Sequence, residues 1–241
     1  MLLTIKNQHE RDKDIIFKEE GHVYILKKYK KPVSVTTFIH NNFPKFNADK
    51  VLKKMRKSAL ESKILKEEWD KNGKKAAKLG TLMHADIERY LNEEKVLKPN
   101  NIEFKFFLNF WNDFKEINGC YIPYRTEWVV YDEEYNLAGS IDCILKDNKN
   151  NMIILDWKRS KEIKKFNVWE RGFYPFDDLD NCNFNHYTLQ LNIYKYILEK
   201  NYGCSIKKMF IVVFHPNNEN YELFEIDKYN IQEKLKLKFK K

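Results

Sequence analysis

Hydrophobic and polar positions follow two different periods along the chain. Up to about Ile117, apolar residues recur at the three- and four-residue spacing of amphipathic helices. From Cys120 onward, the pattern changes to the two-residue alternation that is typical of strands. The sequence therefore predicts a mostly helical first part, followed by a sheet.

Several helices are expected in the first part. Ser34 can cap a short helix that contains Phe38, because a serine hydroxyl accepts hydrogen bonds from free N–H groups of the first turn. Three longer helices are predicted over residues 47–70, 74–93 and 102–117.

The second part begins with three strands, YRTEWVVYD, LAGSIDCILKD and NMIILDWKRS. Turn-rich DEEYN and DNKNN separate them, which predicts an antiparallel meander. A polar and aromatic loop follows over residues 167–183. The pattern then predicts a helix at 187–199, strands at 208–216 and 221–226, and a basic terminal helix. This order favours an α/β or α+β fold, and the absence of repeats and linker-like stretches favours a single globular unit.

The net charge of the chain is compatible with a nucleic-acid partner but does not establish one. The 241 residues carry a formal net charge of +9, which suits a polyanion such as nucleic acid. The chain is also rich in Lys, Asn, Ile and Phe, a bias that an AT-rich genome produces without any binding role. The two explanations are equally compatible with composition alone.

Four cysteines, Cys120, Cys143, Cys182 and Cys204, are spread without a CxxC pair. Neither a structural zinc site nor a disulfide scaffold is suggested. The opening residues lack the apolar run of a signal peptide, and no stretch approaches the roughly 20 apolar residues that cross a bilayer. We expect a soluble, intracellular protein without a membrane partner.

Two acidic residues and an amine occupy neighbouring predicted strands. Asp156 and Lys158 lie two apart, so they project from the same face, opposite Leu155 and Trp157. Asp142 lies on the preceding strand, and a short turn can bring the two carboxylates together around one hard cation. An isolated DxK is usually a surface ion pair, and a lone strand acid is usually solvated.

Two predicted helices carry polar residues at helical spacing. His84 and Glu88 lie four apart after Gly80, and Gln190 and Tyr194 lie four apart further on. Taken singly, such a histidine is ordinarily a packed or surface residue, and such a polar pair is ordinarily a solvated face.

The order of the whole run is more specific than its parts. The succession GxxxHxxIE, Glu127, GxID, DWK and QxxxY resembles the RecB-like branch of the PD-(D/E)XK nucleases, in particular single-domain enzymes related to mitochondrial genome maintenance exonuclease. The resemblance spans about residues 32–214, and PVSVTTFI is a less specific match to the SVT element of those enzymes.

The resemblance implies one nuclease domain over residues 1–241 with a restriction-endonuclease-like core, in which helices flank a mixed central sheet. Residues 1–75 would form an N-terminal hairpin and helical lobe, and residues 76–241 the catalytic core.

The resemblance also implies the roles of individual residues. His84, Asp142, Asp156 and the backbone carbonyl of Trp157 would bind the metal, and Lys158 would be the catalytic lysine. The expected ion is Mg²⁺ or Mn²⁺, since carboxylates suit magnesium and a histidine ligand admits manganese. The single cysteine and cysteine triplet that hold a cluster in some relatives are missing, so no iron-sulfur cluster is expected.

Further residues are expected near the substrate. By the same resemblance, Gln190 and Tyr194 would contact DNA, and Glu88 and Glu127 would complete a second metal site or touch substrate. Phosphate contacts are also expected from Arg159, Ser160, Ser34 and Thr36.

Aromatic residues of the loop at 167–183 offer a further contact with substrate. Trp169, Phe173 and Tyr174, like aromatic residues of the helical lobe, can stack on unpaired bases, although most of these lobe and loop rings are expected to be core.

The leading hypothesis is a metal-dependent DNA exonuclease acting on single strands or ends in replication, repair or recombination. A structure-specific endonuclease is an alternative within the same fold. A non-catalytic nucleic-acid-binding subunit is the alternative from another class.

Overall fold

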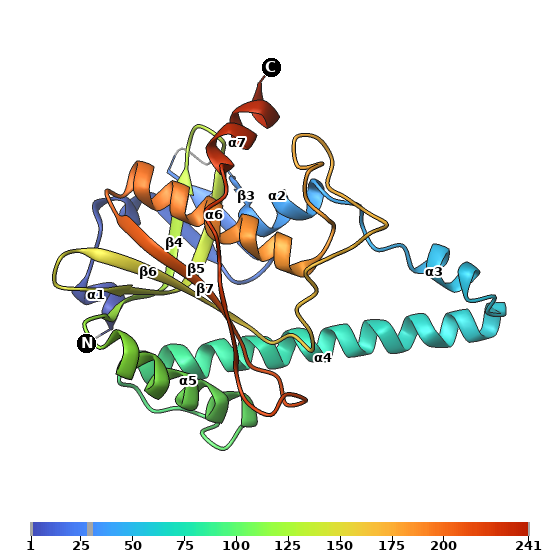
Figure 1. Ribbon diagram of the computed structural model, residues 1–241, viewed down its shortest axis with the longest axis horizontal. Coiled ribbons are helices and arrows are strands. Elements are labelled where there is room, and N and C mark those ends of the chain that lie inside the picture. Colours follow the sequence, from blue (N-terminus) through green and yellow to red (C-terminus); the bar gives the residue numbers. More distant parts are fainter. Residues whose placement is uncertain (1, 28–30, 241) are drawn as a thin grey trace.

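The computed structural model describes residues 2–27 and 31–240, in which a six-stranded mixed sheet lies between two layers of helices (Figure 1). The helices are η1 (Glu10–Asp14), α1 (Leu3–Lys6), α2 (Val35–Asn41), α3 (Ala48–Lys54), α4 (Ala59–Leu91), α5 (Ile102–Asn118), α6 (Asn183–Asn201) and α7 (Ile231–Phe239). The fold is the restriction-endonuclease-like architecture that the sequence predicted.

The predicted meander is confirmed. Its strands β4 (Ile122–Asp132), β5 (Leu137–Lys146) and β6 (Asn151–Lys158) pair antiparallel in succession. After α6, β7 (Ser205–Val213) pairs parallel with β6, and β8 (Glu222–Glu225) pairs antiparallel with β7 at the edge of the sheet. The crossover through α6 therefore makes the sheet mixed and lays that helix across it (Figure 1).

One edge of β5 is shared by two strands. The short strand β3 (Val33–Ser34) pairs parallel with Leu137 and Ala138, at the start of β5. At the other end, β6 pairs with β5 only over residues 143–146. Residues 139–142 of β5 thus have no ladder partner on this edge, and the acidic residues of the predicted site lie at this opening.

The alternation along the central strands divides the core into two clusters. One face of the sheet packs with α2, α6 and α7, and its members include Ile144, Ile154 and Ile211. The other face packs with α5 and the second half of α4, and its members include Cys143, Leu155, Trp157 and Val212. As predicted, Leu155 and Trp157 face away from the side that carries Asp156.

The long helix α4 departs from the prediction. Two helices were expected on either side of residues 71–73, but α4 runs without a break from Ala59 to Leu91. Gly73 lies in the helix with open space around it, so it costs only its propensity penalty of about 1 kcal/mol. The real break comes earlier, where Ser58 and Glu61 form a capping box.

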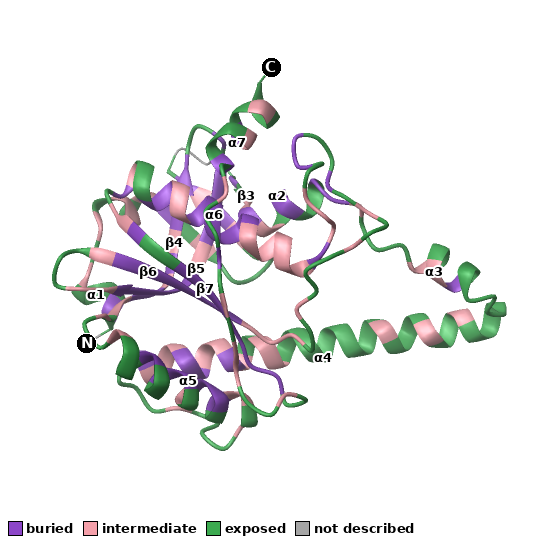
Figure 2. Cartoon of the chain, viewed as in Figure 1, coloured by how far each residue is buried: buried purple, intermediate pink, exposed green. Residues whose placement is uncertain are grey.

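The first half of α4 projects from the rest of the molecule with α3 alongside its end (Figure 1). Most of its residues are exposed, whereas the second half is partly buried beside α5 (Figure 2). Residues 45–80, which include this projecting arm, hold twelve Lys and Arg against five Asp and Glu. A net charge of +7, out of +9 for the chain, is therefore concentrated in this segment.

The N-terminal segment is tied to the sheet by polar contacts. Its strands β1 (Ile15–Lys18) and β2 (Val23–Leu26) form a hairpin, and Arg11 stacks 4.1 Å from the ring centre of Tyr131 on β4.

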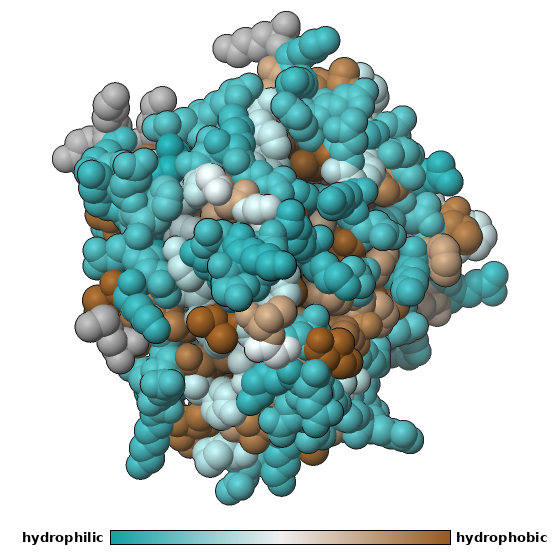
Figure 3. All heavy atoms as spheres, turned by 60° about the vertical axis from the view of Figure 1, so that its left-hand side comes forward, coloured by the Kyte–Doolittle hydropathy of each residue, from teal (hydrophilic) through white to brown (hydrophobic). Residues whose placement is uncertain are grey.

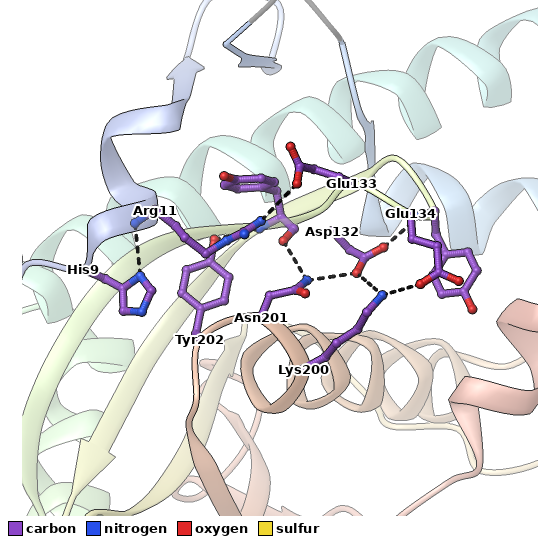
Figure 4. A network of polar contacts seen from close by, with 10 residues as sticks. His9, Arg11, Asp132, Glu133, Glu134, Lys200, Asn201 and Tyr202 are labelled. Carbon is purple, nitrogen blue, oxygen red and sulfur yellow. Dashed lines mark hydrogen bonds and ion pairs between the residues drawn. The ribbon is translucent and has the colours of Figure 1, made fainter.

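An ion pair near Arg11 joins α6 to the same strand, because Lys200 on α6 pairs with Asp132 on β4, 2.8 Å away (Figure 4). The division into an N-terminal lobe and a catalytic core stays a prediction.

The visible face in Figure 3 is largely hydrophilic, with apolar side chains in separate small patches. Among residues 2–27 and 31–240, no helix has both the length and the apolar content needed to cross a bilayer.

Candidate active site

His84 stands where three elements meet. It lies in the second half of α4, and its Nε2 donates to the carbonyl of Trp157 on β6 over 3.0 Å. Nδ1 therefore faces two carboxylates, Asp142 Oδ1 at 3.6 Å and Glu127 Oε1 at 3.7 Å. The predicted histidine is thus beside one predicted ligand, and beside a glutamate whose role was left open.

Glu127 has an unusual backbone conformation. Its φ is +44°, in the left-handed region that a non-glycine residue rarely occupies, although it lies within β4. The register places it opposite Asp142, between the paired Thr126 and Trp128. Ser140 donates to Glu127 Oε2 over 2.9 Å. The carboxylate is therefore held by a local distortion of the strand, of the kind that concentrates at functional sites.

Asp142 lies just beyond the end of the ladder between β5 and β6. Its Oδ2 accepts a hydrogen bond from the backbone N–H of Trp157 over 2.7 Å. Simple alternation would place its two neighbours, Ile141 and Cys143, on the same face of the sheet. Instead, Ile141 packs in one core cluster and Cys143 in the other. The distortion opposite, at Glu127, accompanies this change of face.

Asp156 and Lys158 project together, as predicted. Lys158 Nζ is 2.6 Å from Asp156 Oδ2, and both side chains are largely buried. Gln190 Nε2 donates to the other oxygen, Oδ1, over 3.3 Å. The Lys158 ammonium is the only partner of Oδ2 among the described residues. Because a carboxylate oxygen has two lone pairs, Oδ2 keeps one that a cation can share.

Helix α6 covers the site from one side. Gln190 and Tyr194 are buried on it, with Gln190 Nε2 3.4 Å from the Tyr194 hydroxyl. Sequence reasoning missed Tyr187, whose ring centre lies 4.7 Å from Lys158 Nζ. Its position three residues before Gln190, on the same helical face, was the available signal.

The ligand atoms fit a divalent ion. His84, Glu127 and Asp142 each offer one atom, and these three atoms lie within 4.8 Å of one another. Asp156 is not among these three residues; its carboxylate is turned to Lys158. Hard oxygen donors with one imidazole are a donor set that magnesium and manganese accept.

The pKa values show how the cluster's charge is distributed. Burial raises the pKa of Asp142 to about 7, and the negative charges of Asp156 and Glu127 add to that effect. Burial alone would lower the pKa of His84, but the Asp142 and Glu127 carboxylates outweigh it and raise that pKa to about 9. The positive charges near these carboxylates are thus too few to offset their negative charge. A bound cation would supply the missing positive charge.

Other predicted residues are placed less directly. Burial raises the pKa of Glu88, one turn beyond His84, and Glu127 adds to the shift. Arg159 Nε donates to Glu103 over 2.8 Å, and each side chain is only 12% exposed. Ser160 donates to the carbonyl of Glu162.

Ser34 caps α2, as predicted, by accepting from the N–H of Thr37, and its hydroxyl lies 3.1 Å from that of Thr36. DNA contacts by these two residues, and by Arg159 and Ser160, stay predictions.

The aromatic loop is exposed. Trp169 is 89% exposed, Tyr174 66% and Phe173 51%. The expectation of a core position is therefore wrong for these three loop rings, whereas Phe38 and Phe43 of the helical lobe are buried. Phe176 alone turns inward, and its carbonyl lies so close to Gly172 that a side chain there would overlap it.

Similarity to a known family extends over most of the chain. The profile of the PD-(D/E)XK nuclease superfamily matches residues 27–238. No curated protein sequence matches. Among solved structures, SSO0001 is similar with 15% identity and a TM-score of 0.35, over 86% of this chain and 72% of that one. A candidate exonuclease from Eubacterium rectale shows 15% identity and a TM-score of 0.39, over 65% and 62%.

The fold and the profile match define a nuclease. The chain belongs to the PD-(D/E)XK nuclease superfamily, whose members are metal-dependent enzymes that act on nucleic acid.

Proposed function

We propose that the chain is a deoxyribonuclease of the RecB-like branch that uses Mg²⁺ or Mn²⁺ and removes nucleotides from single strands or DNA ends. Its setting would be replication, repair or recombination. The observation that carries the proposal is the convergence of His84, Glu127, Asp142 and the Asp156–Lys158 pair at the gap between β3 and β6.

His84 Nδ1 and the carboxylates of Glu127, Asp142 and Asp156 would hold the ion, with the Trp157 carbonyl beside them. When bound, a divalent ion polarises a phosphate oxygen and lowers the pKa of a water. The protein fixes the ligand positions through backbone contacts, since Asp142 is held by the N–H of Trp157 and His84 by its carbonyl.

Lys158 would stabilise negative charge that develops on the phosphate. Burial alone lowers its pKa, but Asp156 and Asp142 outweigh that effect and raise it, so the amine keeps its proton. A protonated amine cannot accept a proton from water. Lys158 therefore acts as a compact cation that orients the water and offsets charge on the transition state.

DNA would lie along the projecting arm and the aromatic loop. The arm's net charge of +7 attracts phosphates without regard to sequence. The exposed rings of Trp169, Phe173 and Tyr174 offer faces on which unpaired bases can stack. Stacking needs bases that are free of a duplex, and this favours a single strand or a frayed end as substrate.

The test is a time course on end-labelled DNA with Mg²⁺, Mn²⁺ or chelator. An exonuclease shortens linear single strands and leaves circular ones intact. Cleavage of circular single-stranded DNA would instead establish the endonuclease alternative. Binding without hydrolysis in either metal would establish the non-catalytic alternative.

The matched variant is Lys158→Ala. We expect it to abolish cleavage and to leave DNA binding largely intact, because the arm and loop are unchanged. Cleavage at the wild-type rate would refute the role given to Lys158.

A further inference from the structure

A cavity that the proposed chemistry does not use lies at the first turn of α6, the helix that also carries Gln190. It has a volume of about 600 Å³, within the range of small-ligand pockets. It lies between α2 with the segment that follows it, the aromatic loop and the first turn of α6. Its principal lining residues are His40, Asn41, Phe43, Phe46, Glu170 and His186.

The walls are fastened to one another by hydrogen bonds. The Asn181 side chain donates to the carbonyl of Pro44 over 3.0 Å and to the Glu170 carboxylate over 2.9 Å. The N–H of Phe173 donates to the carbonyl of Asn42 over 2.8 Å. These hydrogen bonds hold the loop against the segment that follows α2, so the cavity is already formed before any ligand binds.

Flat rings line much of this cavity. Phe43 is buried, and its ring centre lies 4.4 Å from that of His186. The His40 ring lies 6.0 Å from His186, and Phe46, which also lines the cavity, is 73% exposed. Such faces suit a flat, aromatic ligand.

The same cavity offers polar groups. Nε2 of His186 is buried and has no hydrogen-bond partner among the described residues. Burial, together with the nearby His40, lowers the pKa of His186 to about 4, so the ring is neutral at physiological pH. The exposed Asn41 amide and the Glu170 carboxylate add a donor and acceptors.

The cavity adjoins the catalytic residues through α6. His186 and Gln190 are four residues apart on one face, about 6 Å along the helix axis. Gln190 contacts Asp156, and Tyr187, next to His186, lies over Lys158. A strand whose phosphate reaches Lys158 can therefore place an adjoining base in the cavity.

We propose that this cavity is a subsite for one unpaired nucleobase of the strand being cut, next to the scissile phosphate. The inference rests on the proposed function and adds to it a defined position for a single base. It differs from stacking on the exposed loop, because the base enters a walled pocket with hydrogen-bonding groups.

The test uses the full chain, in chelator, with a single-stranded deoxyribo-oligonucleotide about 12 nucleotides long, within the length that single-strand-binding modules cover. The fluorescent base 2-aminopurine is placed at successive positions. We expect quenching to be strongest at one position. An abasic residue at that position should weaken binding by about 5- to 150-fold, which is the effect of losing one stacked base.

Two variants probe the cavity in opposite ways. Phe46→Ala removes an exposed ring of the wall, and Asn41→Trp fills the space. Both should abolish the position-specific quenching and the penalty for the abasic residue. Ile117→Ala removes another exposed apolar side chain, on α5, and should change neither.

Binding and hydrolysis separate the two proposals. If the wild type cuts DNA but no position shows quenching that depends on Phe46 and Asn41, the subsite is refuted and the nuclease stands. If the wild type neither binds nor cuts single-stranded DNA, the proposed function fails and the subsite fails with it.

Discussion

Gly139 on β5 lies in close contact with Tyr194 on α6. A Cβ atom added there would lie 2.6 Å from both Cε1 and the hydroxyl of Tyr194. The tyrosine is buried and close to Gln190, so its ring cannot simply swing away. The substitution Gly139→Ala must therefore displace Tyr194, and with it Gln190 next to Asp156.

The expected cost follows from this overlap. Overpacking of a core by one methyl group costs about 1–3 kcal/mol. The reduced flexibility of the unfolded chain offsets about 0.4–1 kcal/mol of that. The free energy of unfolding should fall by roughly 1–2 kcal/mol, or about 2–8 °C in Tm for a chain of this size. Hydrolysis should also slow, because Asp156 loses its positioned neighbour.

Gly73 provides the matched control. It lies inside α4 with nothing within 4 Å of an added Cβ, so Gly73→Ala should stabilise the protein by about 1 kcal/mol. Urea denaturation measures both variants. In a double-mutant cycle, Tyr194→Leu should remove most of the cost of Gly139→Ala. An unchanged cost in that background, or an unchanged midpoint for Gly139→Ala alone, would refute the packing argument.

Three further predictions concern other partly buried groups. The lowered pKa of His186, about 4 against an ordinary value near 6.5, means that the unfolded chain binds a proton more readily. The neutral ring makes its whole contribution to stability above about pH 6.5, and this contribution is lost as pH falls toward 4. The denaturation midpoint should therefore depend less on pH across that window in His186→Gln than in the wild type. Glu103→Gln leaves the Arg159 guanidinium without its charged partner and should cost about 3 kcal/mol in urea denaturation; a change under about 0.5 kcal/mol would contradict the buried pairing. Glu127→Gln should weaken Mn²⁺ binding at least tenfold in calorimetry, and unchanged affinity would exclude the glutamate from the ligands.

The sheet could be predicted because its signals are local. Alternation and turn residues fixed the meander, and the spacing of Asp156 and Lys158 fixed their common face. The parallel pairing of β3 with the start of β5 had no such signal, since two residues carry no period. The interruption at residues 71–73 was also misleading, because an exposed glycine is tolerated inside a long helix.

The motif order drew attention to His84, Asp142 and Asp156, and the fold brings His84 beside Asp142. The motif order could not indicate that Glu127 adopts a left-handed backbone opposite Asp142. That conformation depends on tertiary contacts between strands. The cavity beside His186 depends likewise on hydrogen bonds between distant segments, which no local pattern encodes.

We expect one divalent ion to bind among His84, Glu127, Asp142 and Asp156. Electron paramagnetic resonance can follow Mn²⁺ titrated into the wild type and into Asp142→Asn, with folding checked by circular dichroism. The wild type should bind the ion tightly, and the folded variant should lose this binding. Equal binding by both proteins, or none by the wild type, would contradict this expectation.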